Sequence, residues 1–214
     1  MPSINKKMEY KYNCIKTLEN CTDKIISLIQ LESGDIVTGT NDAQIFIWNI
    51  EESKCIKKIR QNGKVFCLLE FEQNMLLSGT SGNNICLLDL NSMSESFNFL
   101  EHELWITSLV KCNDRIFSSA SNDYTIRIWD YYQRKLIKII PAHEGCILTM
   151  IKLKNGNLCS AGNDSLIKIW DLENKECLYE IPGSSEMIRC LCQLARYFRN
   201  KIITVNKCIY FLIN

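Results

Sequence analysis

Two sets of four residues in this chain combine side chains that could do acid–base chemistry. The first set is His102, Ser119, Asp123 and Trp129, and the second is His143, Ser160, Asp164 and Trp170. In both sets the serine follows the histidine by 17 positions and the tryptophan follows the serine by 10. An imidazole beside a hydroxyl and a carboxylate could act in general acid–base or nucleophilic catalysis. The same residue types also form buried structural networks in which every polar group is paired. The strands and turns around these residues therefore decide between a catalytic site and a structural network.

These sets belong to a repeat that extends along the chain. The segments Ile126–Asp130 and Ile167–Asp171 are near copies, and their tryptophans lie 41 positions apart (170 − 129). Trp48, Leu88 and Phe211 occupy the same position in three other copies. A repeat of about 40–45 residues that ends in Trp-Asp is typical of a β-propeller blade.

Within one copy, short apolar segments alternate with turn residues. In the fourth copy, strands are predicted over 135–140, 146–153, 158–161 and 166–171, with turns rich in Gly, Asn and Asp between them. Apolar–polar alternation with a turn every 8–12 residues or so predicts an antiparallel meander. No segment has a sustained helical period, so almost no helix is expected. The predicted repeats are 14–53, 54–93, 94–133, 134–174 and 175–214, after a short tail at 1–13.

On these residues and spacings, the chain from residue 14 onward resembles the WD-repeat (WD40) family. The resemblance implies an all-β fold, a WD40-type β-propeller built from five four-stranded antiparallel repeats. It also implies that the histidine, hydroxyl, aspartate and tryptophan of each complete set form a buried structural network rather than a catalytic site. The first repeat has Thr38, Asp42 and Trp48 at the matching positions but Cys21 in place of the histidine.

The second and fifth repeats depart further from the family pattern. The second keeps only Ser78 and has Gln61 at the histidine position. No network is therefore expected in the second repeat, and loss of the Gln61 side chain should cost little stability. The fifth repeat has Ser184 at the histidine position and Phe211 at the tryptophan position.

The resemblance leaves the closure of the ring undecided. In this family an N-terminal strand completes the last blade, and pairing of Cys14–Leu18 with Cys208–Ile213 would do so here. Five blades need a wedge of about 72° each, against about 51° in a seven-bladed ring. Three alternatives stay open: a closed five-bladed propeller, an open or partial propeller completed by a partner or a second copy, and a fragment of a longer protein.

Composition excludes several kinds of partner and cofactor. The formal net charge is +1, from 25 basic and 24 acidic residues, so no strongly basic field favours nucleic acid. The 12 cysteines form no Cys-x-x-Cys pair, and we expect neither a metal or other cofactor nor a disulfide framework. The polar N-terminal stretch and the lack of a bilayer-length apolar segment favour a cytoplasmic protein without a membrane partner, with the nucleus as an open alternative.

The chain shows no phosphate loop or nucleophile elbow, so a non-enzymatic protein-interaction scaffold or adaptor is the preferred interpretation. The alternative is a structural partial propeller that contributes blades to a larger complex. The resemblance places the partner surface on the rim where the innermost strands begin. The residues expected there are Lys24, Ile26, Asn41, Lys64, Phe66, Trp105, Thr107, Asn122, Leu148, Asn163, Met187 and Arg189.

Trp105 is the predicted anchor of this surface. Tryptophan and arginine are the types most enriched at interface hot spots, which also favours Arg189 at the edge of the site. The competing interpretation for Ile26, Phe66 and Leu148 is that they turn into the core. For Trp105 that interpretation is weaker, because the neighbouring Ile106 already occupies the core position in the alternation.

Overall fold

The computed structural model describes residues 14, 16–19, 21–183 and 187–193, together with two short strands at Ile203–Val205 and Cys208–Phe211. In this part of the chain, strands and turns form five sheets without any helix, which confirms the all-β prediction. Accordingly, the described residues contain no helix that could span a membrane.

Four of the sheets are four-stranded antiparallel meanders, as the alternation of apolar and turn residues predicts. The first contains β1 (Ile25–Gln30), β2 (Ile36–Thr40), β3 (Gln44–Asn49) and β4 (Lys54–Arg60). The second contains β5 (Val65–Glu72), β6 (Met75–Thr80), β7 (Ile85–Asp89) and β8 (Ser94–Phe99). The third contains β9 (Ile106–Lys111), β10 (Ile116–Ser121), β11 (Thr125–Asp130) and β12 (Lys135–Pro141). The fourth contains β13 (Ile147–Lys152), β14 (Leu158–Gly162), β15 (Leu166–Asp171) and β16 (Glu176–Pro182).

The fifth sheet departs from the predicted meander. It contains β17 (Leu191–Gln193), β18 (Ile203–Val205) and β19 (Cys208–Phe211) in the order β17-β19-β18. β17 and β19 are parallel, and β18 and β19 are antiparallel. The parallel neighbours β17 and β19 are joined by residues 194–207, which include β18, and parallel neighbours need such a longer connection.

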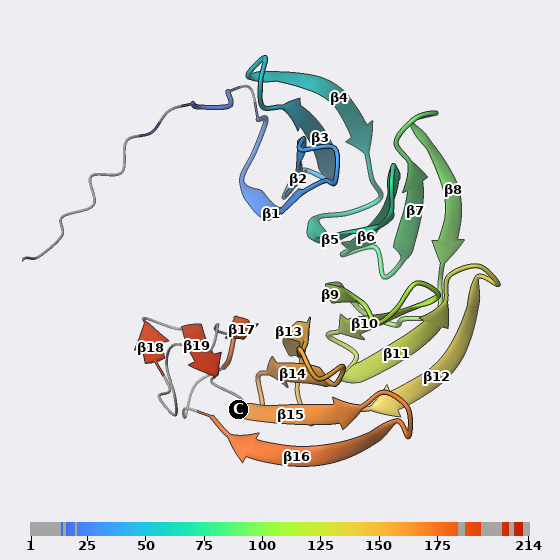
Figure 1. Cartoon of the computed structure of the whole chain (residues 1–214), viewed down its shortest axis with the longest axis vertical. Coiled ribbons are helices and arrows are strands. Elements are labelled where there is room, and N and C mark those ends of the chain that lie inside the picture. The colour runs from blue at the N-terminus through green and yellow to red at the C-terminus, as the bar shows by residue number, and fades with distance from the viewer. Residues whose placement is uncertain are drawn as a thin grey trace, which may run out of the picture.

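The five sheets follow an arc around a central space (Figure 1). The innermost strands β1, β5, β9, β13 and β17 pack in succession along this arc. In Figure 1 the arc is open between β1 and the β17–β19 sheet.

The predicted closing pair of strands is not formed in the described residues. Residues 14 and 16–19 lie outside any strand, and the Lys16 ammonium donates hydrogen bonds to the carbonyls of Ile50 and Glu51. β19 pairs with β17 and β18 instead of with the N-terminal segment. The remaining residues of the predicted pair lie outside the described residues.

The core lies between successive sheets rather than within one sheet. At each contact, aliphatic residues of the two middle strands pack against the innermost strand of the following sheet. Val37, Ile45 and Ile47 pack with Val65 and Leu68. The corresponding groups are Leu77, Ile85 and Leu87 with Ile106 and Leu109, then Ala120, Ile126 and Ile128 with Ile147 and Met150, then Ala161, Ile167 and Ile169 with Ile188 and Leu191.

One turn recurs with the same backbone geometry in four repeats. The residue after the turn aspartate position has a positive φ each time: 64° at Ala43, 65° at Asn83, 70° at Tyr124 and 61° at Ser165. Residues other than glycine seldom adopt this left-handed conformation, and a bulky tyrosine does so least readily. The hairpin therefore imposes this conformation in all four repeats.

Candidate functional site

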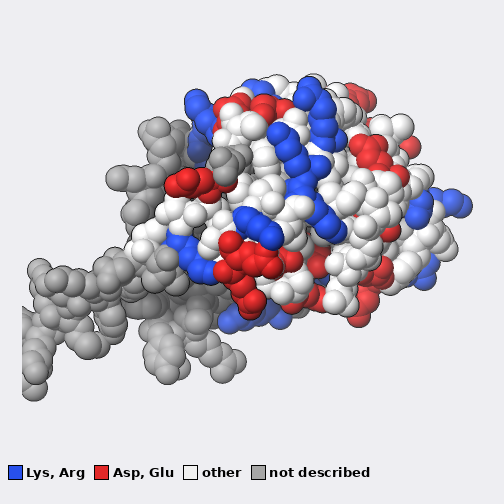
Figure 2. Space-filling model, turned by 90° about the horizontal axis from the view of Figure 1, so that it is seen from above, with Lys and Arg blue, Asp and Glu red and all other residues white. Residues whose placement is uncertain are grey.

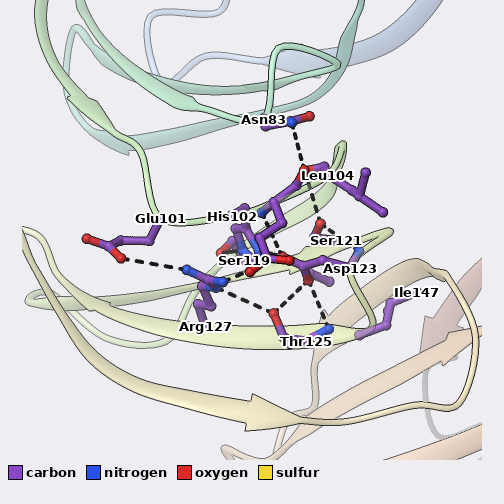
Figure 3. A network of polar contacts seen from close by, with 12 residues as sticks. Asn83, Glu101, His102, Leu104, Ser119, Ser121, Asp123, Thr125, Arg127 and Ile147 are labelled. Atoms are coloured by element: carbon purple, nitrogen blue, oxygen red, sulfur yellow. Dashed lines mark hydrogen bonds and ion pairs between the residues drawn. The ribbon is translucent and has the colours of Figure 1, made fainter.

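The third repeat joins its histidine, serine, aspartate and tryptophan in one buried series. Nδ1 of His102 lies 2.6 Å from a carboxylate oxygen of Asp123, and Nε2 of His102 lies 2.7 Å from the hydroxyl of Ser119. The indole N–H of Trp129 donates to the same hydroxyl over 2.8 Å. Figure 3 shows the histidine between the serine and the aspartate, which lie on β10 and in the turn after it.

The hydrogen bonds define where each proton lies. Burial lowers the pKa of His102 below its usual value, against the opposing effect of Asp123, so the imidazole is neutral at neutral pH. Burial opposes ionisation of Asp123, but hydrogen bonds from His102 and Thr125 hold its pKa well below the usual range. The neutral imidazole donates from Nδ1 to Asp123 and accepts the Ser119 proton at Nε2. Ser119 in turn accepts from Trp129, so every proton in the series has an acceptor.

Ser119, His102 and Asp123 are arranged like a nucleophile, its base and an orienting carboxylate, but a substrate cannot reach the serine. The Ser119 side chain is completely buried, and its oxygen already accepts the Trp129 N–H. A nucleophile must reach the reacting atom, so this geometry locks strands together instead of attacking a substrate. The described residues also contain no group of three or more His, Cys, Asp or Glu side chains that could hold a metal ion.

The fourth repeat repeats the same geometry. His143 lies 2.7 Å from both Asp164 and Ser160, and Trp170 donates to Ser160 over 2.8 Å. Burial again lowers the pKa of His143, and Asp164 opposes the shift. The spacing in the sequence thus corresponds to two equivalent hydrogen-bonded networks in the structure.

A buried arginine adds to the third network and was missed in the sequence analysis. Arg127 is almost fully buried, and its guanidinium lies 3.7 Å from Asp123 and 4.0 Å from Glu101 (Figure 3). At the same position of the fourth repeat, Lys168 forms an ion pair with Glu180 over 2.7 Å. The signal in the sequence was a cation two residues before each tryptophan of a complete set.

The second repeat contradicts the expectation that it has no network. Gln61 is buried, and its amide oxygen accepts a hydrogen bond from the hydroxyl of Ser78 over 2.9 Å. The amide oxygen takes the acceptor role that imidazole Nε2 has in the complete sets, which explains why glutamine fits there. Next to it, the hydroxyl of Thr80 donates to the amide oxygens of Asn62 and Asn84.

The first repeat keeps part of the series. The Trp48 indole donates to Thr38 over 2.9 Å, and the Cys21 thiol also hydrogen-bonds Thr38. Asp42 accepts instead from the hydroxyls of Thr22 and Thr40. A thiol is too short to reach the aspartate as an imidazole does, so threonines take up the carboxylate.

The predicted rim residues lie at the surface, and none is buried. Lys24, Ile26, Lys64, Trp105, Asn163, Met187 and Arg189 are exposed, and Asn41, Phe66, Thr107, Asn122 and Leu148 are half-buried. Ile26, Phe66 and Leu148 are therefore outside the core. Thr107 and Asn122 also tie the rim together, since Thr107 donates to the carbonyl of Ile147 and the Asn122 N–H donates to the carbonyl of Trp105.

Two of these residues form an aromatic stack between neighbouring sheets. The rings of Phe66 and Trp105 have centroids 5.4 Å apart and an interplanar angle of 24°. Trp105 remains 45% exposed, so one part of the indole is available to a ligand. Met187 and Arg189 precede β17 at the fifth sheet, and Leu148 lies on β13 of the fourth.

Leu104 and Tyr124 extend this surface and were missed in the sequence analysis. Both are exposed, and the turn that carries Tyr124 is joined to the Trp105 segment by a hydrogen bond from Ser121 to the Leu104 carbonyl. Asn83 of the second sheet donates to the Glu103 carbonyl (Figure 3), which fixes the segment from its other side. Phe66, Leu104, Trp105 and Tyr124 are together called the aromatic patch below.

The charges outside this patch are mixed. On the face that Figure 2 shows, Lys and Arg side chains and Asp and Glu side chains occur in separate small groups. This agrees with the formal net charge of +1. That face therefore has no extended field of one sign.

Comparison with known proteins identifies the repeat. The family model described as "WD domain, G-beta repeat" matches residues 94–130 and 134–171, which contain the complete networks. The chain is a WD40-repeat protein. Each sheet is thus a blade of a WD40 β-propeller, which in the described residues is open.

Known structures share this WD40 fold. The chain is similar to the structure of U3-55K, with a TM-score of 0.75 and 18% identity over 83% of this chain and 57% of that one. It is equally similar to the WD40 repeats of RRP9, with a TM-score of 0.76 and 18% identity over 83% and 56%. The chain therefore spans little more than half of each of these structures.

Curated relatives match shorter stretches. The ribosome biogenesis protein YTM1 of Debaryomyces hansenii is 27% identical over 114 residues, which cover 49% of this chain and 24% of that protein. The human DDB1- and CUL4-associated factor 5 is 31% identical over 104 residues, which cover 44% and 11%. The chain spans about a quarter or less of either relative.

Proposed function

We propose that this WD40-repeat protein is a non-enzymatic interaction scaffold that binds an extended peptide or loop at the aromatic patch. The observation that carries the proposal is the stacked pair of Phe66 and Trp105, whose indole is 45% exposed at the rim. A stacked, half-exposed indole offers a rigid apolar surface with little entropy left to lose on binding. The names of two relatives, a ribosome biogenesis protein and a DDB1- and CUL4-associated factor, support the same general role.

The segment that carries Trp105 is held in place before any ligand binds. Hydrogen bonds from Asn83, Ser121 and Asn122 to the carbonyls of residues 103–105 fix its backbone from the second and third blades. A preorganised site loses less entropy on binding. The burial of Ser119 and Ser160 further supports a binding role over hydrolysis, because both serines in a triad-like setting are out of reach of a substrate.

The test is selection of peptides from a random phage-displayed library on the immobilised full chain. We expect the selected peptides to carry a large apolar or aromatic residue, because that is the complement of the patch. Trp105→Ala should weaken their binding by about 2 kcal/mol, roughly thirtyfold in Kd, as measured by calorimetry. Its melting temperature should stay close to that of the wild type, because the indole is half-exposed.

Tyr132→Ala is the matched control, because Tyr132 is an exposed aromatic residue on the turn between β11 and β12. It should leave peptide binding unchanged. Peptides that bind the Trp105 variant as tightly as the wild type would overturn the proposal. A large loss of stability in that variant would also overturn it, since Trp105 would then act in the core.

A further inference from the structure

The turn residue Asn122 carries an unpaired amide oxygen beside the aromatic patch. Among the described residues, Oδ1 of Asn122 is the one buried side-chain nitrogen or oxygen without a hydrogen-bond partner. The main-chain N–H of Asn122 donates to the Trp105 carbonyl over 3.0 Å, and Tyr124 lies two residues further along the same turn. A buried polar atom without a partner costs the free protein stability, so it needs an explanation.

The first and second blades show how the side chain at this position is otherwise paired. The same main-chain hydrogen bond identifies the position, since the N–H of Asn41 donates to Lys24 and that of Ser81 donates to Lys64. In both blades the side chain is also bonded to the segment before the innermost strand. The amide of Asn41 donates to Asp23 over 2.8 Å, and the hydroxyl of Ser81 accepts from the Lys64 N–H over 2.9 Å.

Leu104 explains why Asn122 differs. It occupies the position of Asp23, one residue before the carbonyl that accepts the main-chain bond, and it therefore replaces the carboxylate that Asn41 binds. An aliphatic side chain offers no hydrogen bond. Leu104 is 46% exposed and Asn122 is half-buried, so the third blade combines an apolar side chain and an unpaired amide at the surface.

We propose that the Asn122 carboxamide binds the main chain of an extended peptide whose apolar side chain lies on the aromatic patch. This inference rests on the proposed peptide-binding function. A carboxamide has an acceptor oxygen and N–H donors in one plane, so it can bind the N–H and the C=O of a single residue. In an extended chain these two groups of a residue point in the same direction, as they do between antiparallel strands.

The oxygen becomes accessible to a ligand by rotation of the carboxamide. The terminal torsion of asparagine has a broad energy minimum, and the side chain of Asn122 is only half-buried. Because Oδ1 has no partner in the free protein, its rotation towards a ligand breaks no hydrogen bond of that oxygen. A ligand N–H therefore adds a hydrogen bond without competing with an existing one.

The test is a double-mutant cycle between Asn122 and the main chain of a peptide selected on the full chain. Versions of the peptide with one N-methylated amide each are titrated by calorimetry against the wild type and Asn122→Ala. We expect Asn122→Ala to weaken binding of the unmethylated peptide about fivefold in Kd. At one amide, methylation should weaken binding to the wild type about fivefold more than binding to the variant, which has no acceptor left to lose.

The melting temperature of Asn122→Ala should not fall, because the change removes an unpaired oxygen and keeps the main-chain bond to Trp105. Asn91→Ala is the matched control. Asn91 is an exposed asparagine on the turn between β7 and β8, at the opposite end of the second sheet from the start of β5. It should bind every peptide as the wild type does.

Peptides that need Trp105 but bind Asn122→Ala as tightly as the wild type would overturn this inference and leave the proposed function intact. If Asn122→Ala weakened binding without coupling to any methylated amide, the carboxamide would bind a ligand side chain, and the main-chain assignment would be wrong. A clear drop in the melting temperature of Asn122→Ala would show that the amide is paired within the chain. Peptides that bind equally well without Trp105 would overturn the proposed function itself.

Discussion

Single polar residues in this propeller are tied to single hydrogen bonds, and the second blade shows what the position requires. His143 accepts from Ser160 in the fourth blade, and Gln61 accepts from Ser78 in the second. Both acceptors are buried. The position therefore requires a buried acceptor for the serine proton. An amide oxygen meets this requirement as well as an imidazole nitrogen does.

We predict that His143→Ala and Gln61→Ala each lower the free energy of unfolding by about 1–3 kcal/mol, because each leaves a buried serine proton without an acceptor. Urea denaturation of the two variants measures this. Gln133→Ala is the control, because Gln133 is exposed, and should change the free energy by less than about 0.5 kcal/mol. A Gln61 variant as stable as the control would show that its bond to Ser78 contributes nothing.

The buried histidines also make stability depend on pH. Burial lowers the pKa of His102 and of His143 in the folded state, so between that value and the ordinary one near 6.5 the unfolded chain binds more protons. Stability should therefore fall as the pH drops below about 6.5.

The double variant His102→Gln, His143→Gln should lose this dependence, because an amide does not titrate. The measurement is the change in unfolding free energy between two pH values, one near neutral and one near 5, for variant and wild type. In the wild type, hydrogen bonds hold the pKa of Asp123 well below its usual range, so this carboxyl stays ionised at both pH values. An equal change in the two proteins would contradict a neutral buried imidazole.

At the scale of elements, the period of the repeat predicted the strands of the first four blades well. It predicted the strand order of the fifth blade poorly. In the fourth repeat, the predicted strand over 166–171 is β15 with the same bounds. Period-two alternation and turn residues are local signals, and they suffice where each strand pairs with its sequence neighbour. The parallel pairing of β17 with β19 depends on a contact across the sheet, which alternation does not encode.

The polar network was partly predictable, because the spacing of its residues is also a local signal. Histidine, serine and tryptophan follow a fixed spacing because strand pairing fixes their register, as Ser119 opposite Arg127 illustrates. The roles of Gln61 and Arg127 were not predictable, because they depend on burial and on which neighbour the side chain reaches. The stack of Phe66 on Trp105 likewise joins different blades, and the spacing within one repeat says nothing about it.

The contact between successive blades leaves little space at two glycines, Gly39 and Gly79. A Cβ at Gly79 on β6 would come within 2.6 Å of a methyl carbon of Ile106 and 2.5 Å of the Cys67 sulfur. Ile106 is fully buried, and a β-branched side chain cannot easily change its rotamer.

We predict that Gly79→Ala destabilises the protein by about 1–3 kcal/mol, because the second and third blades must move apart. Thermal and urea denaturation measure the effect. Ala120 occupies the corresponding position of the third blade, which shows that an alanine is compatible with the strand geometry itself. A Gly79 variant as stable as the wild type would mean that the blades adjust their spacing at no cost.

At the scale of the whole molecule, the hydrophobic packing of the described residues joins blades that are neighbours along the arc. The third blade is packed on both sides, through Ile106 and Leu109 on one side and Ile126 and Ile128 on the other. Among the described residues, the first blade packs against the second through Val37, Ile45 and Ile47, and Leu28 on its other side is exposed. In such an array, stability is approximately a sum of the stability of each unit and the contacts between neighbours.

We therefore predict a gradient of local stability along the arc, which hydrogen exchange with mass spectrometry measures on the full chain. Amides of β10 and β14, which belong to blades with complete networks and two neighbours, should exchange most slowly. Amides of β2 should exchange faster although β2 is also a middle strand, because the first blade packs against one other blade in the described part of the chain and lacks the histidine. Equal protection of β2, β10 and β14 would show instead that the blades unfold together as one cooperative unit.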